Sequence, residues 1–60
     1  MTFAQWLIYN SAKMSHPNDN ISAMEREGVV YITRSRNNEV LQQVEVASNG
    51  HLKHTYYKED

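Results

Sequence analysis

Hydrophobic and polar residues alternate with a period of two from Val40 to Tyr57, which is the clearest pattern in the chain. This is the spacing of a β-strand with one buried face. The turn-forming residues Ser48-Asn49-Gly50 divide the stretch in two. We therefore predict a β-hairpin with strands at about 39–47 and 51–57.

The length of the hairpin loop follows from the faces of its two strands. A two-residue turn at Asn49-Gly50 would set the valines of the first strand against the polar side of the second. A three-residue loop instead places Val46 opposite Leu52, with the glycine in the left-handed conformation. We prefer the three-residue loop because it keeps the apolar side chains on one face.

The first residues carry the signature of a helix start. Thr2 and Gln5 form a capping-box pattern, in which each side chain bonds the backbone of the other, and this predicts a helix at about 3–14. A strand through 6–9 is the alternative, because aromatic and branched residues cluster there. At about 100° per residue, one broad face of the helix gathers Phe3, Ala4, Leu7, Ile8, Ser11 and Met14, opposite Gln5, Tyr9 and Lys13. We expect the first set to pack on the sheet.

Turn-forming residues follow from Ser15 to Asn20, and Pro17 excludes a continuous helix through them. The residues at about 21–27 then have the composition of a short second helix, which Asn20 would cap and Gly28 would end.

The stretch at about 29–35 has the most strand-like composition in the chain. A three-residue loop at 36–38 would place Val30 and Ile32 on the buried face, whereas a two-residue turn would bury the face of Tyr31. We choose the three-residue loop.

Together the elements predict an α+β fold with a single small domain at 1–60. An N-terminal amphipathic helix, with a short second helix, packs on a three-stranded antiparallel β-meander. We expect residues 58–60 to form a frayed tail.

Composition narrows the range of functions. The chain has 60 residues, no cysteine and a formal net charge of −1, so we expect a soluble, cytoplasmic protein with no disulfides and no general attraction to polyanions. The apolar run near the N-terminus is too short for a membrane span. Few large apolar residues are present for a chain of this size, so we expect a protein partner or a homodimer to add burial.

The sequence gives little support for a catalytic site or a metal site. His51 and His54 are three residues apart, which on a strand points them to opposite faces, so they do not chelate one ion. The chain has only two glycines and neither a phosphate-binding loop nor a dinucleotide fingerprint. We therefore expect no enzyme activity, no cofactor and no metal.

A local basic feature suggests that the chain binds nucleic acid, which is our second hypothesis after protein binding. The expected hairpin tip gathers four polar and basic residues, namely Arg34, Arg36, Asn37 and Asn38. One side of the sheet could add Lys53, His51 and Tyr57 to them. The simpler interpretation is a solvated hairpin end.

One part of the sequence resembles a known family of regulators. It consists of Met24-Glu25-Arg26-Glu27-Gly28-Val29-Val30, followed by Arg34 to Glu39 and then by Val40 to Val46. This order resembles the end of the recognition helix and the wing of a winged helix-turn-helix regulator. The resemblance implies that Arg34 and Arg36 contact phosphate or the minor groove, in a miniature nucleic-acid-binding regulator.

The first hypothesis is a small, non-catalytic protein-binding module. Its edge strands, at 29–35 and 51–57, could accept another strand. The aromatic anchors would be Trp6, Tyr9, Tyr31 and Tyr57. In size and charge balance such a chain is similar to inhibitors and regulators of host proteins that phages and other mobile elements encode.

Overall fold

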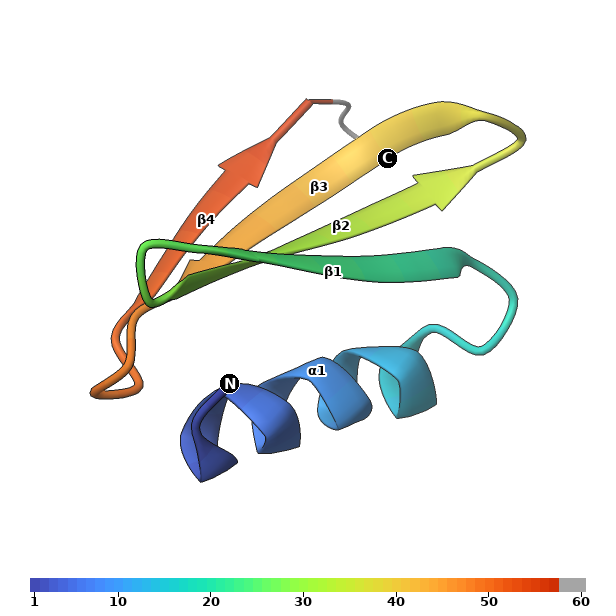
Figure 1. The fold of residues 1–60 in the computed structure, drawn as a ribbon. Helices are drawn as coiled ribbons and strands as arrows, with labels where there is room; N and C mark the ends of the chain where they lie inside the picture. The colour runs from blue at the N-terminus through green and yellow to red at the C-terminus, as the bar shows by residue number, and fades with distance from the viewer. Residues whose placement is uncertain (58–60) are drawn as a thin grey trace.

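The computed structural model describes residues 1–57, so the predicted tail at 58–60 lies outside the described residues. The elements in chain order are α1 (Phe3–Ser15), β1 (Asn20–Arg26), β2 (Val29–Arg36), β3 (Glu39–Val46) and β4 (Leu52–Tyr56). The strands form one antiparallel sheet in the order β1-β2-β3-β4, and α1 lies across one face of it (Figure 1). The α+β class and the helix on a meander are confirmed.

The sheet has one strand more than predicted. The segment expected to be a short helix at 21–27 is β1, which pairs with β2 from Asn20↔Ser35 to Arg26↔Val29. Pairing on both sides satisfies the backbone of β2, and this tertiary gain outweighs the helix propensity of the Ala-Met-Glu-Arg run. Glu27 and Gly28 form the connecting turn, and both have positive φ.

The hairpin of β3 and β4 follows the predicted register. Val46 pairs with Leu52, Val44 with His54 and Gln42 with Tyr56. Gly50 has a φ of +91°, as the left-handed loop position requires. The three-residue loop is confirmed.

The turn between β2 and β3 differs from the prediction, yet the predicted face is buried. Arg36 pairs directly with Glu39, so the loop is the two-residue turn Asn37-Asn38, with φ of 54° and 65°. A β-bulge where the register shifts at Arg34/Ser35 then moves the pairing by one residue. The bulge restores the face of Val30 and Ile32 to the helix side.

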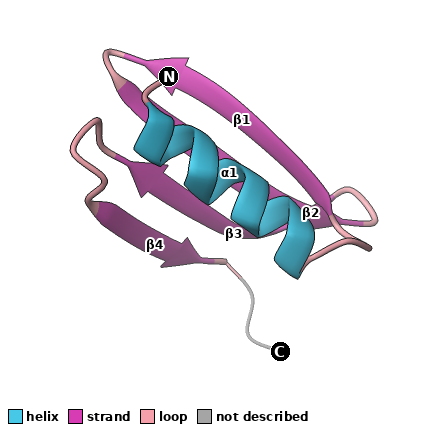
Figure 2. Cartoon of the chain, turned by 90° about the horizontal axis from the view of Figure 1, so that it is seen from below, coloured by secondary structure: helices cyan, strands magenta, loops and turns pink. Residues whose placement is uncertain are grey.

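The core lies between α1 and the middle of the sheet. Its buried cluster is Val30, Ile32 and Val46, against which Ile8, Tyr9, Ala12, Ile21 and Val44 pack. One helix is about 10 Å wide and strands lie about 4.8 Å apart, so α1 covers only part of the sheet. Figure 2 shows β4 beside the helix and not under it.

Gln5, in the first turn of α1, is completely buried between the helix and the sheet. The predicted capping box is present, since the Gln5 backbone N donates to Thr2 Oγ1 at 3.2 Å and Thr2 N donates to Gln5 Oε1 at 2.8 Å. The amide Nε2 of Gln5 also donates to the Gly28 and Val46 carbonyl oxygens, at 2.8 and 2.9 Å. Residues 6–9 lie within α1, so the predicted helix is confirmed. Its predicted inner face is right for Ile8, which packs on the core, and wrong for Phe3, Leu7 and Met14, which are exposed.

Candidate functional site

A stripe of large apolar side chains faces solvent on α1. Its members are Phe3, Trp6, Leu7 and Met14, which are 74%, 52%, 45% and 82% exposed. We call these four residues the outer helix stripe. The rings of Phe3 and Trp6 stack with centroids 6.4 Å apart and an interplanar angle of 16°.

The stripe faces outward because the opposite side of the helix meets the sheet. Gln5, Ile8 and Ala12 occupy that inner side, and a straight helix cannot turn Phe3 or Met14 inward at the same time. Three of the residues predicted to pack on the sheet, Phe3, Leu7 and Met14, are thus in the wrong layer. The hydrogen bonds of Gln5 determine this rotation.

The four predicted aromatic anchors do not lie together. Trp6 belongs to the outer helix stripe, whereas Tyr9 is half-buried against the core with the Lys13 ammonium 5.1 Å from its ring centroid. Tyr31 alternates with the core residues of β2, so it points to the sheet face away from α1. Tyr57 is exposed just after β4.

One of the two predicted edge strands is in the interior of the sheet. β2, predicted at 29–35, pairs with β1 and with β3, so it cannot accept another strand. The edges are β1 and β4. Of the two strands expected at an edge, only the one predicted at 51–57, observed as β4, lies there.

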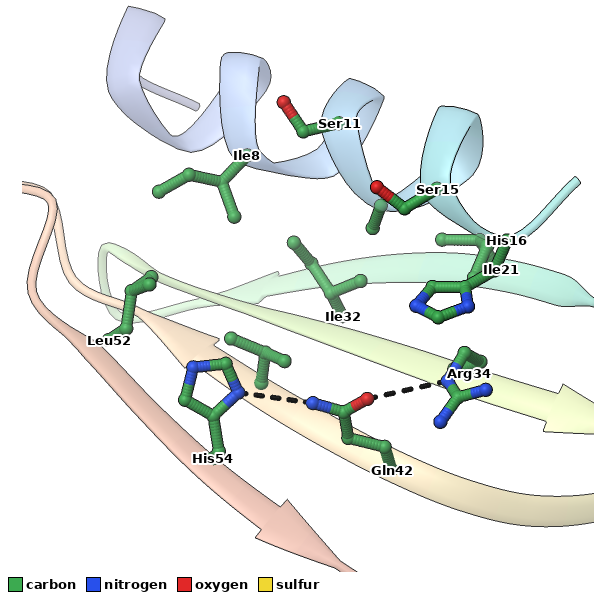
Figure 3. Close-up of a pocket in the computed structure, with 12 residues that line it drawn as sticks. Ile8, Ser11, Ser15, His16, Ile21, Ile32, Arg34, Gln42, Leu52 and His54 are labelled. Atoms are coloured by element: carbon green, nitrogen blue, oxygen red, sulfur yellow. Dashed lines mark hydrogen bonds between the residues drawn. The ribbon is translucent and has the colours of Figure 1, made fainter. Parts of the chain in front are cut away.

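A cleft of about 210 Å³ opens between the C-terminal part of α1 and strands β1 to β4 (Figure 3). Its polar wall is a hydrogen-bonded row across the sheet. Arg34 Nε donates to Gln42 Oε1 at 3.3 Å, and Gln42 Nε2 lies 3.1 Å from His54 Nδ1. Because the Gln42 oxygen accepts from Arg34, its nitrogen donates to His54. The lining residues are Ile8, Ser11, Ala12, Ser15, His16, Ile21, Ile32, Arg34, Gln42, Val44, Leu52 and His54.

The row continues into an ion-pair cluster that the sequence did not predict. Asp19, in the loop before β1, accepts from Arg34 Nη1 at 2.9 Å and from Arg36 Nε at 2.6 Å. These charge-assisted hydrogen bonds, that of Arg36 first and that of Arg34 second, lower the pKa of the Asp19 carboxyl to about 2. The side chain of Asp19 is only 3% exposed. The two arginines predicted to contact nucleic acid therefore both bind this carboxylate.

The other predicted nucleic-acid residues are divided between two places. Asn37 and Asn38 form the tight turn between β2 and β3. Lys53 pairs in register with Glu45, in the set of β4 residues that alternates with those facing α1. The structure therefore does not bring Lys53 to the arginine pair.

The winged-helix resemblance is not matched by the observed elements. Residues 24–26, which would end a recognition helix, lie in β1, and α1 is the single helix among residues 1–57. This part of the resemblance is wrong.

The Asp19 cluster predicts an acid-sensitive contribution to stability. Because the folded pKa of Asp19 lies below its ordinary value of 3.8, the ion pairs stabilise the fold above that value, and this contribution is lost as the pH falls toward about 2. We expect Asp19→Asn to be less stable than wild type at pH 6, with the difference shrinking on acidification. Urea unfolding of both proteins at several pH values measures this, and a difference that stays constant down to pH 2 would contradict it.

Neither a metal-binding group nor a membrane-spanning helix is found in the described part of the chain. Residues 1–57 contain no group of three or more His, Asp or Glu side chains arranged to hold a metal ion. In the same residues, no helix is long and apolar enough to cross a membrane. Comparison of the chain with protein-family models, curated proteins and solved structures found no match.

Proposed function

We propose that this chain is a small, non-catalytic protein-binding module whose contact surface is the outer helix stripe. The observation that carries the proposal is the distribution of apolar side chains on α1. Four large apolar side chains of α1 face solvent, and only two, Ile8 and Tyr9, pack on the core beside the buried Gln5.

The spacing of the stripe is that of a helix that binds in a groove. Trp6 and Leu7 follow Phe3 at positions i+3 and i+4, so their side chains lie on one side of the helix. Aromatic residues dominate the binding energy of many interfaces, and the stacked rings of Phe3 and Trp6 present one continuous aromatic surface. None of the four stripe residues is charged, so the complementary surface is an apolar groove.

Small size and the lack of cysteine support a role as an inhibitor or regulator of a host protein, of the kind that phages and other mobile elements encode. The proposed place of action is the cytoplasm.

Affinity capture with matched variants tests the proposal. Leu7→Glu places a charge in the centre of the stripe, and Met24→Glu makes an equivalent change at an exposed methionine of β1. Burying an unpaired carboxylate is costly. We therefore expect at least one protein to be captured equally by wild type and Met24→Glu, and its captured amount to fall at least about tenfold with Leu7→Glu. Quantitative mass spectrometry of the captured proteins measures this. An identical set of proteins on all three baits would overturn the proposal.

Nucleic-acid binding through Arg34 and Arg36 remains a separate hypothesis. Both guanidinium groups donate to Asp19, so phosphate binding would compete with an existing carboxylate. For this reason we place it second to protein binding.

A further inference from the structure

We propose that the outer helix stripe binds a second copy of this chain, with the two α1 helices antiparallel across a twofold axis. The inference rests on the proposed function, because it concerns the same surface, which the second copy covers when no other protein is bound. Three features of α1 support it: the spacing of its outward residues, its charge distribution and the apolar area that it exposes.

The outward residues repeat at the spacing of a helix-pairing seam. Phe3, Leu7, Asn10 and Met14 are separated by four, three and four residues, which keeps them on one line of the helix. The series reads the same from either end. An antiparallel copy therefore sets Phe3 against Met14 of the second copy and Leu7 against its Asn10, so one surface complements itself.

The chemistry of the paired positions favours this direction. Phe3 against Met14 is a sulfur–aromatic contact, and it forms twice in the dimer. Parallel pairing would instead set Phe3 against Phe3 and Met14 against Met14, which loses both sulfur–aromatic contacts, although it would let the two Asn10 amides hydrogen-bond to each other. In the monomer the Asn10 amide donates to the Trp6 carbonyl oxygen at 2.9 Å, so one of its two N–H groups keeps a partner in either arrangement.

Charge also favours antiparallel pairing. Lys13 is the one charged residue of α1, and its ammonium lies 5.1 Å from the Tyr9 ring centroid, beside the seam. Parallel helices would bring the two Lys13 side chains to the same end of the dimer, whereas antiparallel helices keep them at opposite ends. Antiparallel pairing places each Lys13 toward the N-terminal end of the other α1, where the Met1 ammonium is already paired with Glu25 at 3.0 Å.

The exposed area allows a weak dimer. At about 200 Å² for each large side chain, the exposed fractions of the four stripe residues amount to roughly 500 Å² per copy, so complete burial would remove at most about 1,000 Å² in total. That total is close to the lower limit for specific interfaces. We therefore expect a dissociation constant in the micromolar range.

Sedimentation velocity from about 1 μM to 1 mM tests the inference, with Leu7→Glu and Met24→Glu as matched variants. We expect wild type and Met24→Glu to dimerise, and Leu7→Glu to raise the dimer dissociation constant by about 100-fold. Leu7 is already 45% exposed, so we expect the variant to fold. Circular dichroism checks this. A wild type that is monomeric throughout, or a dimer that only Met24→Glu weakens, would overturn the inference.

Cysteine cross-linking tests the direction of the helices. The chain has no natural cysteine, so a single introduced thiol has no other partner. On mild oxidation we expect a mixture of Phe3→Cys and Met14→Cys to give the mixed disulfide in preference to either homodimer. Preferential self-linking of Met14→Cys would indicate parallel helices and overturn the antiparallel arrangement.

The two proposals fail in different ways. A monomeric wild type whose captured partner is lost in Leu7→Glu would remove the dimer and leave the protein-binding function. A helix-paired dimer that captures no other protein would leave self-association as the use of this surface.

Discussion

Replacing Gln5 by Glu is expected to lower the free energy of unfolding by about 3 to 5 kcal/mol at pH 7. The Gln5 amide is fully buried, and its Nε2 donates to the carbonyl oxygens of Gly28 and Val46. A carboxylate has no hydrogen to donate and would face both oxygens. Since a domain of this size is stabilised by only about 3 to 9 kcal/mol, much of the variant should be unfolded.

The matched control is Gln43→Glu, the same amide-to-carboxylate change at a half-buried position of β3. We expect it to change stability by less than about 1 kcal/mol. In Gln5→Glu, burial raises the folded pKa of the introduced carboxyl, so this variant is most stable below the ordinary glutamate pKa and loses stability as the pH rises. Urea unfolding at pH 4 and pH 7 measures both effects. A Gln5→Glu protein as stable as wild type at pH 7 would show that Gln5 does not join the helix to the sheet.

The hairpin at β3 and β4 was predictable because every local signal agrees. Alternation, turn residues and the face of the valines each require the same register, and Val46 pairs with Leu52 accordingly. β1 was not predictable in this way. Its sequence favours a helix, and only pairing with β2, which the sequence does not display, makes it a strand.

The outward stripe was mispredicted for a related reason. Apolar periodicity assigns Phe3, Leu7 and Met14 to the core, but it gives no weight to a glutamine that can satisfy two backbone carbonyl groups. The capping box did identify Gln5 as a helix-start residue. Recognising its second role requires knowing that the β1–β2 turn and the end of β3 lie beneath the helix.

Part of the candidate site was visible in the sequence. Trp6 was expected as an anchor, and it lies in the outer helix stripe. The Asp19 cluster was missed, because its carboxylate meets Arg34 and Arg36 only once β1 pairs with β2 and brings the preceding loop to that end of the sheet. An isolated acidic residue between turn formers gave no signal of this contact.

Replacing Val30 by Ala should lower the free energy of unfolding by about 2 kcal/mol, because Val30 is completely buried under α1 and its loss leaves a cavity in a small core. Val40→Ala makes the same chemical change at a side chain that is 42% exposed, so we expect an effect below about 0.5 kcal/mol. Urea unfolding of both variants measures the difference. The comparison depends on the bulge: with the Asn37-Asn38 turn and no register shift, Val30 would face away from the helix. Equal, small losses in the two variants would therefore mean that β2 presents its other face to α1.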